Sequence, residues 1–391
     1  MIAPDKMRAN PTSKKIEIPS LYEALCDIPD PRERQGRRHP LPSMLAVACV
    51  ALLCGYRSPY AISEWVANYG HRYLRTFKFT RPKPPGQATW YRVLGVIDRE
   101  ALEMRLVVWA QGLLKALGYD EAQLLGIGID GKALRGSKQQ GATDTHLLSA
   151  VAHGLGITLG QLAVPDKTNE IGAIVDLLGM LIIKGCVITT DALLTQVKVA
   201  QTILAREGDY VFIVKENQKT LYEDIQLLFE SPPPLLRGQS WPQSETTNKR
   251  HGRLEIRSLT AATTLNDYLT WPGVQQVFQV TRTVTRQGKT TTEVVYGVTS
   301  LTPEEASAAR LLTFTREHWH IENKSHWVRD VTFDEDRSQV RRGNLPHVMA
   351  ALRNAVISLL RTAGIKNIAQ ALRKFAAQPD KAVALVGMPG E

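Results

Sequence analysis

The sequence predicts an α/β fold: a mixed β-sheet with helices on both faces, preceded by an all-helical region. Two observations support this prediction. Between residues 119 and 230, three strand-like apolar runs precede alternating helical and strand-like runs, which is the order of a sheet with crossover connections. In the first hundred residues, apolar positions instead recur at helical spacing between prolines and glycines. A chain of 391 residues is long enough for two or three domains.

Charge and cysteine usage narrow the class of protein. The formal net charge is +10, and the first 110 residues alone hold 17 Lys and Arg against 10 Asp and Glu. This excess favours a polyanionic partner such as nucleic acid, although a solubilising basic surface explains the charge about equally well. The four cysteines lack metal-ligand spacing, which indicates a reducing compartment and argues against a disulfide scaffold or a zinc site.

The hydropathy pattern contains no targeting or membrane segment. The most apolar run, residues 44–54, is too short to span a bilayer, and residues 1–20 lack the apolar core of a signal peptide. We therefore expect a cytoplasmic protein with no membrane partner.

Residues 20–118 are expected to form a helical domain that follows a basic, flexible tail at 1–19. Apolar spacing predicts helices at 21–28, 41–53, 60–69 and 98–117, and Thr89 is expected to cap a further helix. The connecting loops are basic, so the domain could present a helix to DNA. A purely structural helical cap is the alternative.

Residues 119–230 are expected to form the first part of the core. Strands are predicted at 124–130, 146–153, 157–164, 186–191 and 210–215, with helices at 169–181 and 195–206. Three consecutive antiparallel strands followed by two crossovers are the topology of a ribonuclease H-like sheet. In that topology the first and fourth strands are neighbours.

The second half of the chain changes character twice. A helix at 220–229 runs into Ser-Pro-Pro-Pro at 231–234, and residues 231–302 then read as a β-rich insertion with strands at 254–259, 276–284 and 291–299. Residues 303–365 return to a helical pattern and are expected to complete the core, with a last apolar helix at 345–360. Residues 366–391 read as a C-terminal tail.

Two neighbouring strands of the predicted sheet end on acids, Asp130 and Asp191. A buried carboxylate at a sheet edge is destabilised unless it binds a metal or another cation. With a third carboxylate, Glu322, this set would suit two Mg²⁺ (or Mn²⁺) ions, with Asp130 bridging them. Such a pair of ions supports in-line displacement at phosphorus.

Glu322 is predicted to lie on a helix that ends at about residue 330. At α-helical spacing, His318, His326 and Arg329 share its face. Four nearby residues are expected off this face: the rival acids Glu317 and Asp330, and two tryptophans that should pack in the core, Trp319 and Trp327.

Five sequence strings together resemble one protein family. They are IDGKALR at 129–135, TTDA at 189–192, YVFIVKENQ at 210–218, HGRLEIR at 251–257 and HWHIENKSHW at 318–327. In collinear order from about residue 20 to 365, the chain resembles the DDE transposases of bacterial insertion sequences, in the ISAs-type branch that includes the H-repeat-associated proteins. The resemblance implies a ribonuclease H-like core with a β insertion, a helical N-terminal domain, and catalysis by Asp130, Asp191 and Glu322 with Mg²⁺.

The resemblance further implies a DNA transposase that cleaves the ends of a mobile element and joins them to target DNA. Its partners would be double-stranded DNA and a second copy of the chain, since two ends need two active sites, and it would be associated with the bacterial nucleoid. Two alternatives remain: a nuclease or resolvase without strand transfer, and a DNA-binding remnant without catalysis.

Basic and polar residues near these motifs are candidate DNA contacts. Those after the first aspartate could grip phosphates or form surface ion pairs, and those of 251–257 could belong to a DNA-contacting hairpin or to an exposed strand face. The pair before the last helix could bind phosphate near the acids or line that helix. The candidates are Lys132, Arg135, Lys215, Asn217, His251, Arg253, Arg257, His326, Arg329, Arg341 and Arg342.

Overall fold

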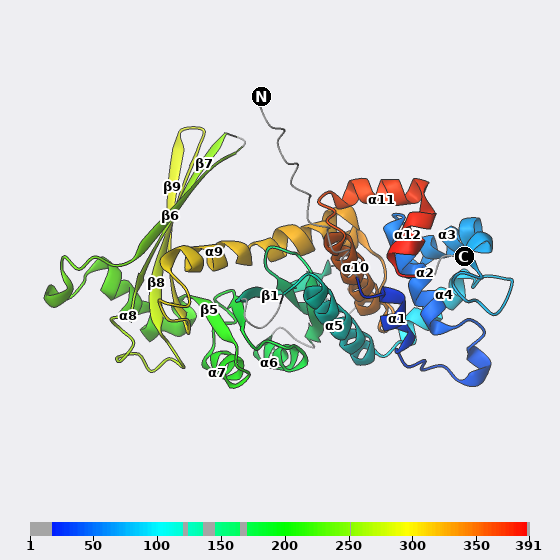
Figure 1. The fold of residues 1–391 in the computed structure, drawn as a ribbon, viewed down its shortest axis with the longest axis horizontal. Helices are drawn as coiled ribbons and strands as arrows, with labels where there is room; N and C mark the ends of the chain where they lie inside the picture. The colour runs from blue at the N-terminus through cyan, green and yellow to red at the C-terminus, as the bar shows by residue number, and fades with distance from the viewer. Residues whose placement is uncertain (1–17, 120–123, 136–144, 165–169, 251, 389–391) are drawn as a thin grey trace, which may run out of the picture.

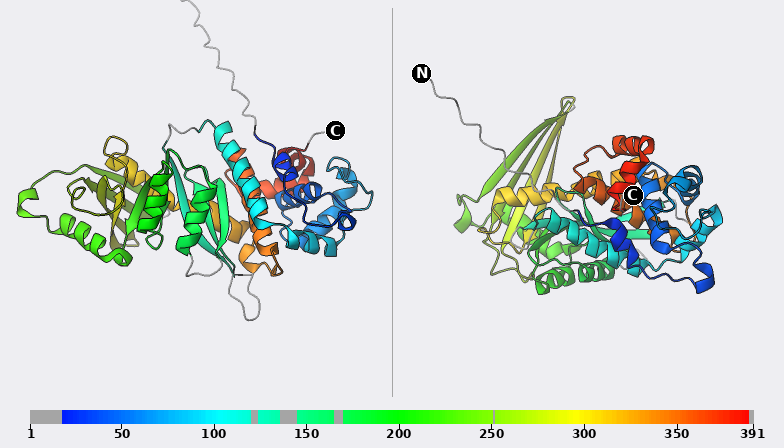
Figure 2. Two further views of the ribbon diagram at one scale, coloured as in Figure 1. Left: turned by 90° about the horizontal axis from the view of Figure 1, so that it is seen from below. Right: turned by 45° about the vertical axis from the view of Figure 1, so that its right-hand side comes forward.

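The protein is described by a computed structural model that covers residues 18–119, 124–135, 145–164, 170–250 and 252–388. Its centre is one nine-stranded mixed sheet with the strand order β3-β2-β1-β4-β5-β9-β8-β7-β6. A helical region that contains both the first and the last helices lies at one end, and the outer strands project at the other (Figure 1). Two further views show the same separation (Figure 2).

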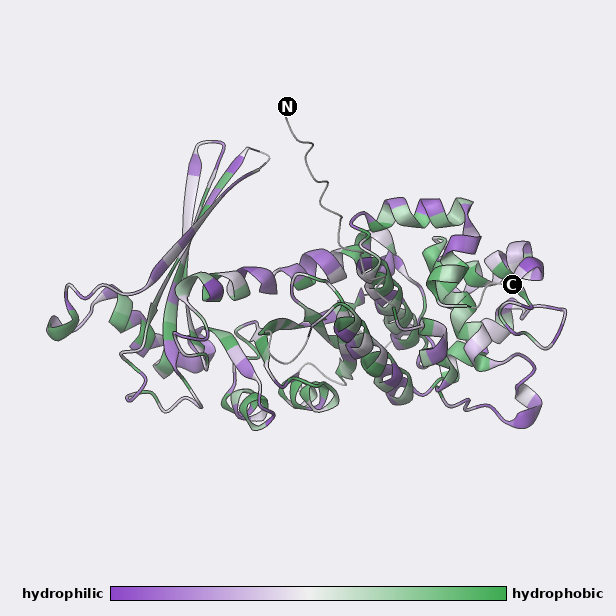
Figure 3. Ribbon diagram, viewed as in Figure 1, coloured by the Kyte–Doolittle hydropathy of each residue, from purple (hydrophilic) through white to green (hydrophobic). Residues whose placement is uncertain are grey.

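The helical region is organised around α2 (Leu41–Leu53), in which only Pro42 is not buried. A helix that is apolar on all sides must be surrounded, and α2 is coloured as hydrophobic along its length (Figure 3). The helices that contact it are α1 (Leu21–Cys26), α3 (Pro59–Tyr73), α10 (Leu345–Thr362), α11 (Ile368–Ala377) and α12 (Pro379–Leu385). The helices predicted at 21–28, 41–53 and 60–69 are therefore present.

Two expectations for the helical parts are wrong. Thr89 does not cap a helix, because α4 (Gln87–Val96) begins earlier, after the extended backbone of Gly86. Residues 368–385, expected within a tail, form α11 and α12 instead. In α11 the buried Leu372 and Phe375 share one face, which packs on α2. The expected long helix at 98–117 is α5 (Arg99–Ala116).

The first five strands confirm the predicted ribonuclease H-like order. They are β1 (Leu125–Leu134), β2 (Thr145–Ala152), β3 (Thr158–Val164), β4 (Cys186–Thr190) and β5 (Asp209–Val214). β1, β2 and β3 pair antiparallel, and β1 also pairs with β4 in parallel. The first and fourth strands are thus neighbours.

β1 is longer than predicted and does not stop at Asp130. Its parallel pairing with β4 ends at Ile129, opposite Thr190. Residues 130–134 continue the strand because they keep antiparallel partners on β2. Asp130 therefore lies where β1 separates from β4, rather than at the end of the strand.

The strands of residues 231–302 extend the same sheet. They are β6 (Gln243–Arg250), β7 (Arg253–Ala262), β8 (Gln276–Arg286) and β9 (Lys289–Thr299). β9 pairs antiparallel with β5, and β8, β7 and β6 follow in order. β6 has the polar sequence QSETTNKR and is the edge strand, which explains why the hydropathy pattern did not predict it.

Helices cover both faces of the sheet. α9 (Ala308–His318) contacts β1, β4 and β5 on one face, where it encloses an apolar cluster with Val187 and Val211. α6 (Glu170–Met180) and α7 (Val197–Ala205) lie on the other face, which presents the next residues in sequence, Ile188 and Phe212. α8 (Lys219–Glu230) contacts β9.

Among the described residues, no helix is long and apolar enough to cross a membrane.

A buried ion cluster joins the last helices to the segment that follows α9. Glu335 accepts hydrogen bonds from Arg329 at 2.7 Å and from Arg353 of α10 at 2.8 Å. All three side chains are at most 2 % exposed. Burial alone would raise the pKa of Glu335, but Arg329 and Arg353 hold it below its usual range. Arg353 also donates to the backbone carbonyl of Arg57, so the cluster reaches the helical region.

Replacing Glu335 by Gln is expected to lower the free energy of unfolding by about 3–5 kcal/mol, because two buried guanidinium groups lose their shared counter-charge. Urea titration at neutral pH, followed by tryptophan fluorescence, measures this loss. The exposed Glu304→Gln is the matched control and should change stability by less than about 0.5 kcal/mol. Equal losses in the two variants would show that the cluster does not stabilise the fold.

Candidate active site

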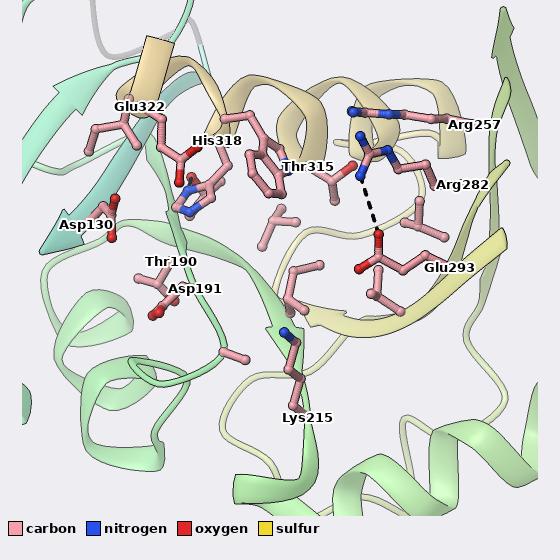
Figure 4. Close-up of a pocket in the computed structure, with 18 residues that line it drawn as sticks. Asp130, Thr190, Asp191, Lys215, Arg257, Arg282, Glu293, Thr315, His318 and Glu322 are labelled. Carbon is pink, nitrogen blue, oxygen red and sulfur yellow. Dashed lines mark hydrogen bonds and ion pairs between the residues drawn. The ribbon is translucent and has the colours of Figure 1, made fainter. Parts of the chain in front are cut away.

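Three acids line one cavity of about 300 Å³ on the α9 side of the sheet. Asp130 comes from β1, Asp191 follows β4, and Glu322 lies just beyond α9 (Figure 4). The structure therefore brings together the three carboxylates that the sequence singled out, although they are separated by 61 and 131 residues along the chain.

Asp130 is the most buried of the three acids. Its side chain is 24 % exposed, and its Oδ1 accepts a hydrogen bond from the backbone N–H of Gly131 at 2.8 Å. Burial raises the pKa of Asp130 to about 7, and the charges of Asp191 and Glu322 add to this rise. At neutral pH this carboxyl group is thus only partly ionised, and a bound cation would favour its charged form.

Asp191 is exposed and is the first residue after β4. Its Oδ1 accepts from the backbone N–H of Leu194 at 3.1 Å, which closes a turn toward α7. Two hydrogen bonds connect this turn to β5 and to the residues just after it. Asn217, which follows β5, donates through Nδ2 to the carbonyl of Ala192 at 2.8 Å, and Thr195 donates to the carbonyl of Ile213 in β5. Asn217, predicted as a DNA contact, is therefore engaged with the loop that carries Asp191.

Glu322 is exposed and lies in a π-helical segment, η6 (Glu322–His326), which is followed by a second one, η7 (Val328–Thr332). The sequence predicted one continuous α-helix here. Because a π-helix bonds each N–H to the fifth carbonyl back, residues at α-helical spacing no longer share a face. His318 still lines the cavity with Glu322, whereas Arg329 is turned into the protein interior.

A chain of hydrogen bonds connects His318 to Thr189 and His153. Its Nδ1 lies 2.9 Å from the hydroxyl of Thr189, and the same hydroxyl lies 2.9 Å from Nε2 of His153. Burial lowers the pKa of His318 to about 4 and that of His153 to about 3, so both rings are neutral at neutral pH. A Cβ at Gly126 would collide with the His153 ring, so glycine on β1 is what admits this imidazole.

His326 lies against Asp130 rather than on the surface. Its Nδ1 is 3.6 Å from Oδ2 of Asp130, and the residue is 9 % exposed. Burial lowers the pKa of His326 to about 3, with Arg329 and Lys132 contributing. His326, predicted as a DNA contact, is therefore a nearly buried, neutral imidazole beside Asp130.

The donor set fits hard divalent cations. Carboxylate oxygens are the ligands that Mg²⁺ and Mn²⁺ prefer, and the mutual repulsion of Asp130 with its two neighbours is what such a cation would relieve. Within the described ranges, no group of three or more His, Cys, Asp or Glu side chains is already arranged to hold a metal ion. Asp191 and Glu322 are both exposed, so an ion can reach their carboxylates from solvent.

The opposite wall of the cavity is basic. Lys215 from the end of β5 is exposed and faces the cavity, together with Arg257 of β7 and Arg282 of β8 (Figure 4). Arg282 pairs with Glu293 at 3.4 Å, and both arginines contact Glu255. The cavity thus has an acidic wall and a basic wall, and the predicted candidates Lys215 and Arg257 belong to the latter.

The residues after Asp130 are engaged in ion pairs. Lys132 is 8 % exposed, with its Nζ 2.5 Å from Asp330 and 3.5 Å from Asp336. Arg135 lies 3.8 Å from Asp336 with most of its side chain exposed. The ion-pair alternative therefore describes both residues, although Arg135 is still open to solvent.

The remaining candidates lie in different places. Arg253 is paired with Glu255 beside a second cavity of about 500 Å³, and His251 lies outside the described residues. Arg329 is fully buried against Glu335, so it is not available to DNA. Arg341 and Arg342 are exposed, and Arg342 lines a cleft on the helical region rather than the acid cavity.

Two tryptophans expected in the core are instead on the surface. Trp319 is 50 % exposed and Trp327 is 56 % exposed. Trp319 lines both the acid cavity and the cavity beside Arg253. The expectation that both tryptophans pack in the core, which assumed that large apolar side chains are buried, is therefore wrong.

Several site residues were not predicted. Thr189 and His153 were missed because each lies within an apolar strand pattern, and Arg282 and Glu293 because their position depends on the register of β8 and β9, where they are paired. The signal for the first two was local: a polar residue within an apolar run that can hydrogen-bond inward.

Two family models together match most of the chain. Residues 121–359 match the family described as "Transposase DDE domain", and residues 22–110 match the family described as "DDE_Tnp_1-associated". The chain is 30 % identical to the "H repeat-associated putative transposase YhhI" of Escherichia coli K12, over 88 % of this chain and 91 % of that one. It is 29 % identical to the "Putative transposase YncI" of Escherichia coli O157:H7, over 88 % of each chain.

Among solved structures, a piggyBac transposase synaptic complex with hairpin DNA aligns with 95 % of this chain and 80 % of that one. The TM-score is 0.42 and the identity 8 %, too low to support any conclusion about fold or function.

Replacing Asp130 by Asn is expected to stabilise the metal-free protein at pH 8. The raised pKa means that the folded state holds this proton more tightly than the unfolded chain, so stability falls as pH rises from about 4 through about 7. Removing the charge should raise the free energy of unfolding by up to about 4 kcal/mol at pH 8 and by less at pH 5. Thermal unfolding at the two pH values measures this difference.

The same measurement with Mg²⁺ tests metal binding without any activity. The parent protein should gain stability when Mg²⁺ is added at pH 8, and Asp130→Asn should gain much less. The exposed Asp176→Asn of α6 is the control and should respond to Mg²⁺ like the parent. An equal response of the parent and Asp130→Asn would place the metal elsewhere.

Proposed function

The chain belongs to the family of transposases with a DDE domain, and on this premise we propose that it cleaves DNA at the ends of a mobile element and joins the freed 3′-hydroxyls to target DNA. The observation that carries the proposal is the convergence of Asp130, Asp191 and Glu322 on one cavity. Both steps are phosphoryl transfers, so one site can perform them in turn.

The metal chemistry follows from the donor set. When bound by Asp130, Asp191 and Glu322, two Mg²⁺ (or Mn²⁺) ions would activate the attacking oxygen and stabilise the departing one. Of the three residues that would hold the metal, Asp130 would gain most from it, because the charges of the other two acids add to the rise in its pKa.

The other residues of the cavity position the substrate and the acids. Lys215 and Arg282 lie across from the carboxylates, where a cation can hold a phosphate oxygen of the DNA. His318 and Thr189 fill the floor as neutral groups, so they add no charge that would compete with a metal. His326 is a neutral group beside Asp130, with its Nδ1 3.6 Å from Oδ2 of that carboxylate.

Transposition requires two element ends to be processed together. One chain carries one set of the three acids, so we propose that two copies assemble on DNA. Bacterial transposition takes place on the nucleoid, and we expect the protein to be found there.

Single Ala substitutions of Asp130, Asp191 and Glu322 are expected to reduce Mg²⁺-dependent nicking of element-end DNA below detection, because each removes a ligand that the chemistry needs. Gel analysis of end-labelled DNA measures nicking. Glu304→Gln, an exposed acid away from the cavity, should retain the parent activity. Nicking by any of the three Ala variants at the parent rate would refute the assignment of that acid.

Strand transfer is tested separately with pre-cleaved ends. Joining of the 3′-hydroxyl to a target plasmid supports a transposase. Hydrolysis without joining would instead identify a nuclease or resolvase. DNA binding with neither hydrolysis nor joining would identify a DNA-binding remnant without catalysis.

Asn217→Ala is expected to slow cleavage by roughly 10-fold, as the loss of a hydrogen bond of about 1.4 kcal/mol would do, while leaving DNA affinity unchanged. The reason is that Asn217 braces the Asp191 loop through the Ala192 carbonyl. Lys215→Ala is the paired comparison and should weaken DNA binding. A loss of affinity in Asn217→Ala would return this residue to the set of DNA contacts.

A further inference from the structure

A third cavity, of about 670 Å³, lies on the helical region and shares no lining residue with the acid cavity. Three separate stretches of chain form it: the loop at 32–39, helix α4, and the loop at 342–343 before α10. Among the residues described, its lining contains arginines and a histidine but no Asp or Glu. We call it the basic cleft, and its charged lining residues are Arg32, Arg38, Arg92 and Arg342.

Three of these four arginines are available to a ligand. Arg38, Arg92 and Arg342 are exposed, and within the described part of the chain none of them forms an ion pair. Arg32 is different, because it donates two hydrogen bonds to Asp30 and another to the carbonyl of His39. Arg32 therefore holds the loop, while the other three present uncompensated charge.

Positive charge around the cleft affects the protonation of His39, which lines it. His39 packs edge-on against Phe79. Burial lowers the pKa of His39, and the charges of Arg81, Arg32 and Arg38 lower it further. Positive charge from the loop at 32–39 and from Arg81 thus converges on one side of the cleft.

Arg342 is fixed in place by the contacts of the two residues that follow it. Gly343 has a φ of +55°, and a Cβ at this position would lie 2.9 Å from the carbonyl oxygen of Gly95 in α4. Asn344 donates its backbone N–H to the same carbonyl at 3.2 Å and its Nδ2 to the carbonyl of Ile97 at 2.8 Å. The loop from the core is therefore docked on α4, and the cleft is a built feature of the junction.

We propose that the basic cleft binds the phosphate backbone of double-stranded DNA, as a contact separate from the acid-lined cavity. The choice of DNA rests on the proposed function. Guanidinium groups bind phosphate oxygens through paired N–H donors, and three exposed arginines around one cleft suit the repeated charges of a polymer better than a single small anion. Because Arg342 belongs to the catalytic half and Arg92 to the helical half, bound DNA would bridge the two.

The salt dependence of binding tests this proposal. The full-length chain is titrated with a fluorescent duplex of arbitrary sequence in EDTA, so that cleavage does not interfere, at several KCl concentrations. Each lost phosphate contact should reduce the slope of log K against log[KCl] by about 0.9. This change is expected in each of the single variants Arg38→Gln, Arg92→Gln and Arg342→Gln. In the triple variant the magnitude of the slope should fall by about 2–3.

Arg373→Gln, on the exposed side of α11, is the matched control with the same loss of charge and should leave the slope unchanged. Thermal unfolding of each variant confirms that it is folded. An unchanged slope in the triple variant, or an equal reduction in Arg373→Gln, would overturn the proposal. Tighter binding of an RNA duplex, or of inorganic phosphate, through the same arginines would overturn the assignment to DNA.

The two proposals fail in different ways. Normal cleavage of element ends together with an unchanged salt slope refutes the basic cleft alone. Absence of cleavage together with a slope that depends on Arg38, Arg92 and Arg342 refutes the proposed catalytic function alone.

Discussion

The parallel pairing of β1 with β4 is the constraint on which the site depends. It aligns Ile129 with Thr190, and the two strands separate at the next residue of each, Asp130 and Asp191. A shift of register by one residue would turn every side chain of the strand to the opposite face. The register that buries Val187 and Ile188 on the two sides of the sheet therefore also places two carboxylates where β1 and β4 separate.

The third carboxylate depends on packing of a different kind. Glu322 follows α9 on the π-helical segment η6, and the next segment, η7, is anchored by Arg329 to the buried Glu335. Glu335 in turn holds Arg353, which bonds to the backbone of the helical region. A buried ion cluster of this kind tolerates no loss of a partner, since the remaining charges would be left without compensation. The geometry of the acid cavity is thus coupled to parts of the fold that do not touch it.

Sequence patterns predicted the elements well where one local signal dominated. The uniformly apolar α2, the strand order around Asp130, and the helices beside β4 follow from periodicity alone. β6 was missed because a polar edge strand has no apolar alternation, and its identity comes from pairing with β7. The helix α11 was missed although its apolar spacing was present, because a short amphipathic segment near the end of a chain needs a partner surface, here α2, to be stable.

The sequence by itself determined the order of the first five strands, the choice of Asp130, Asp191 and Glu322 as candidate site acids, and the family to which the chain belongs, because these follow from short-range patterns and from motif strings in order. The tertiary structure decided the rest. It paired Lys132 with Asp330, buried Arg329 and His326, exposed Trp319, and brought Arg342 to α4. Such outcomes depend on contacts between residues far apart in the chain, where the balance between desolvation and a suitably placed partner decides whether a charge is buried or left for a ligand.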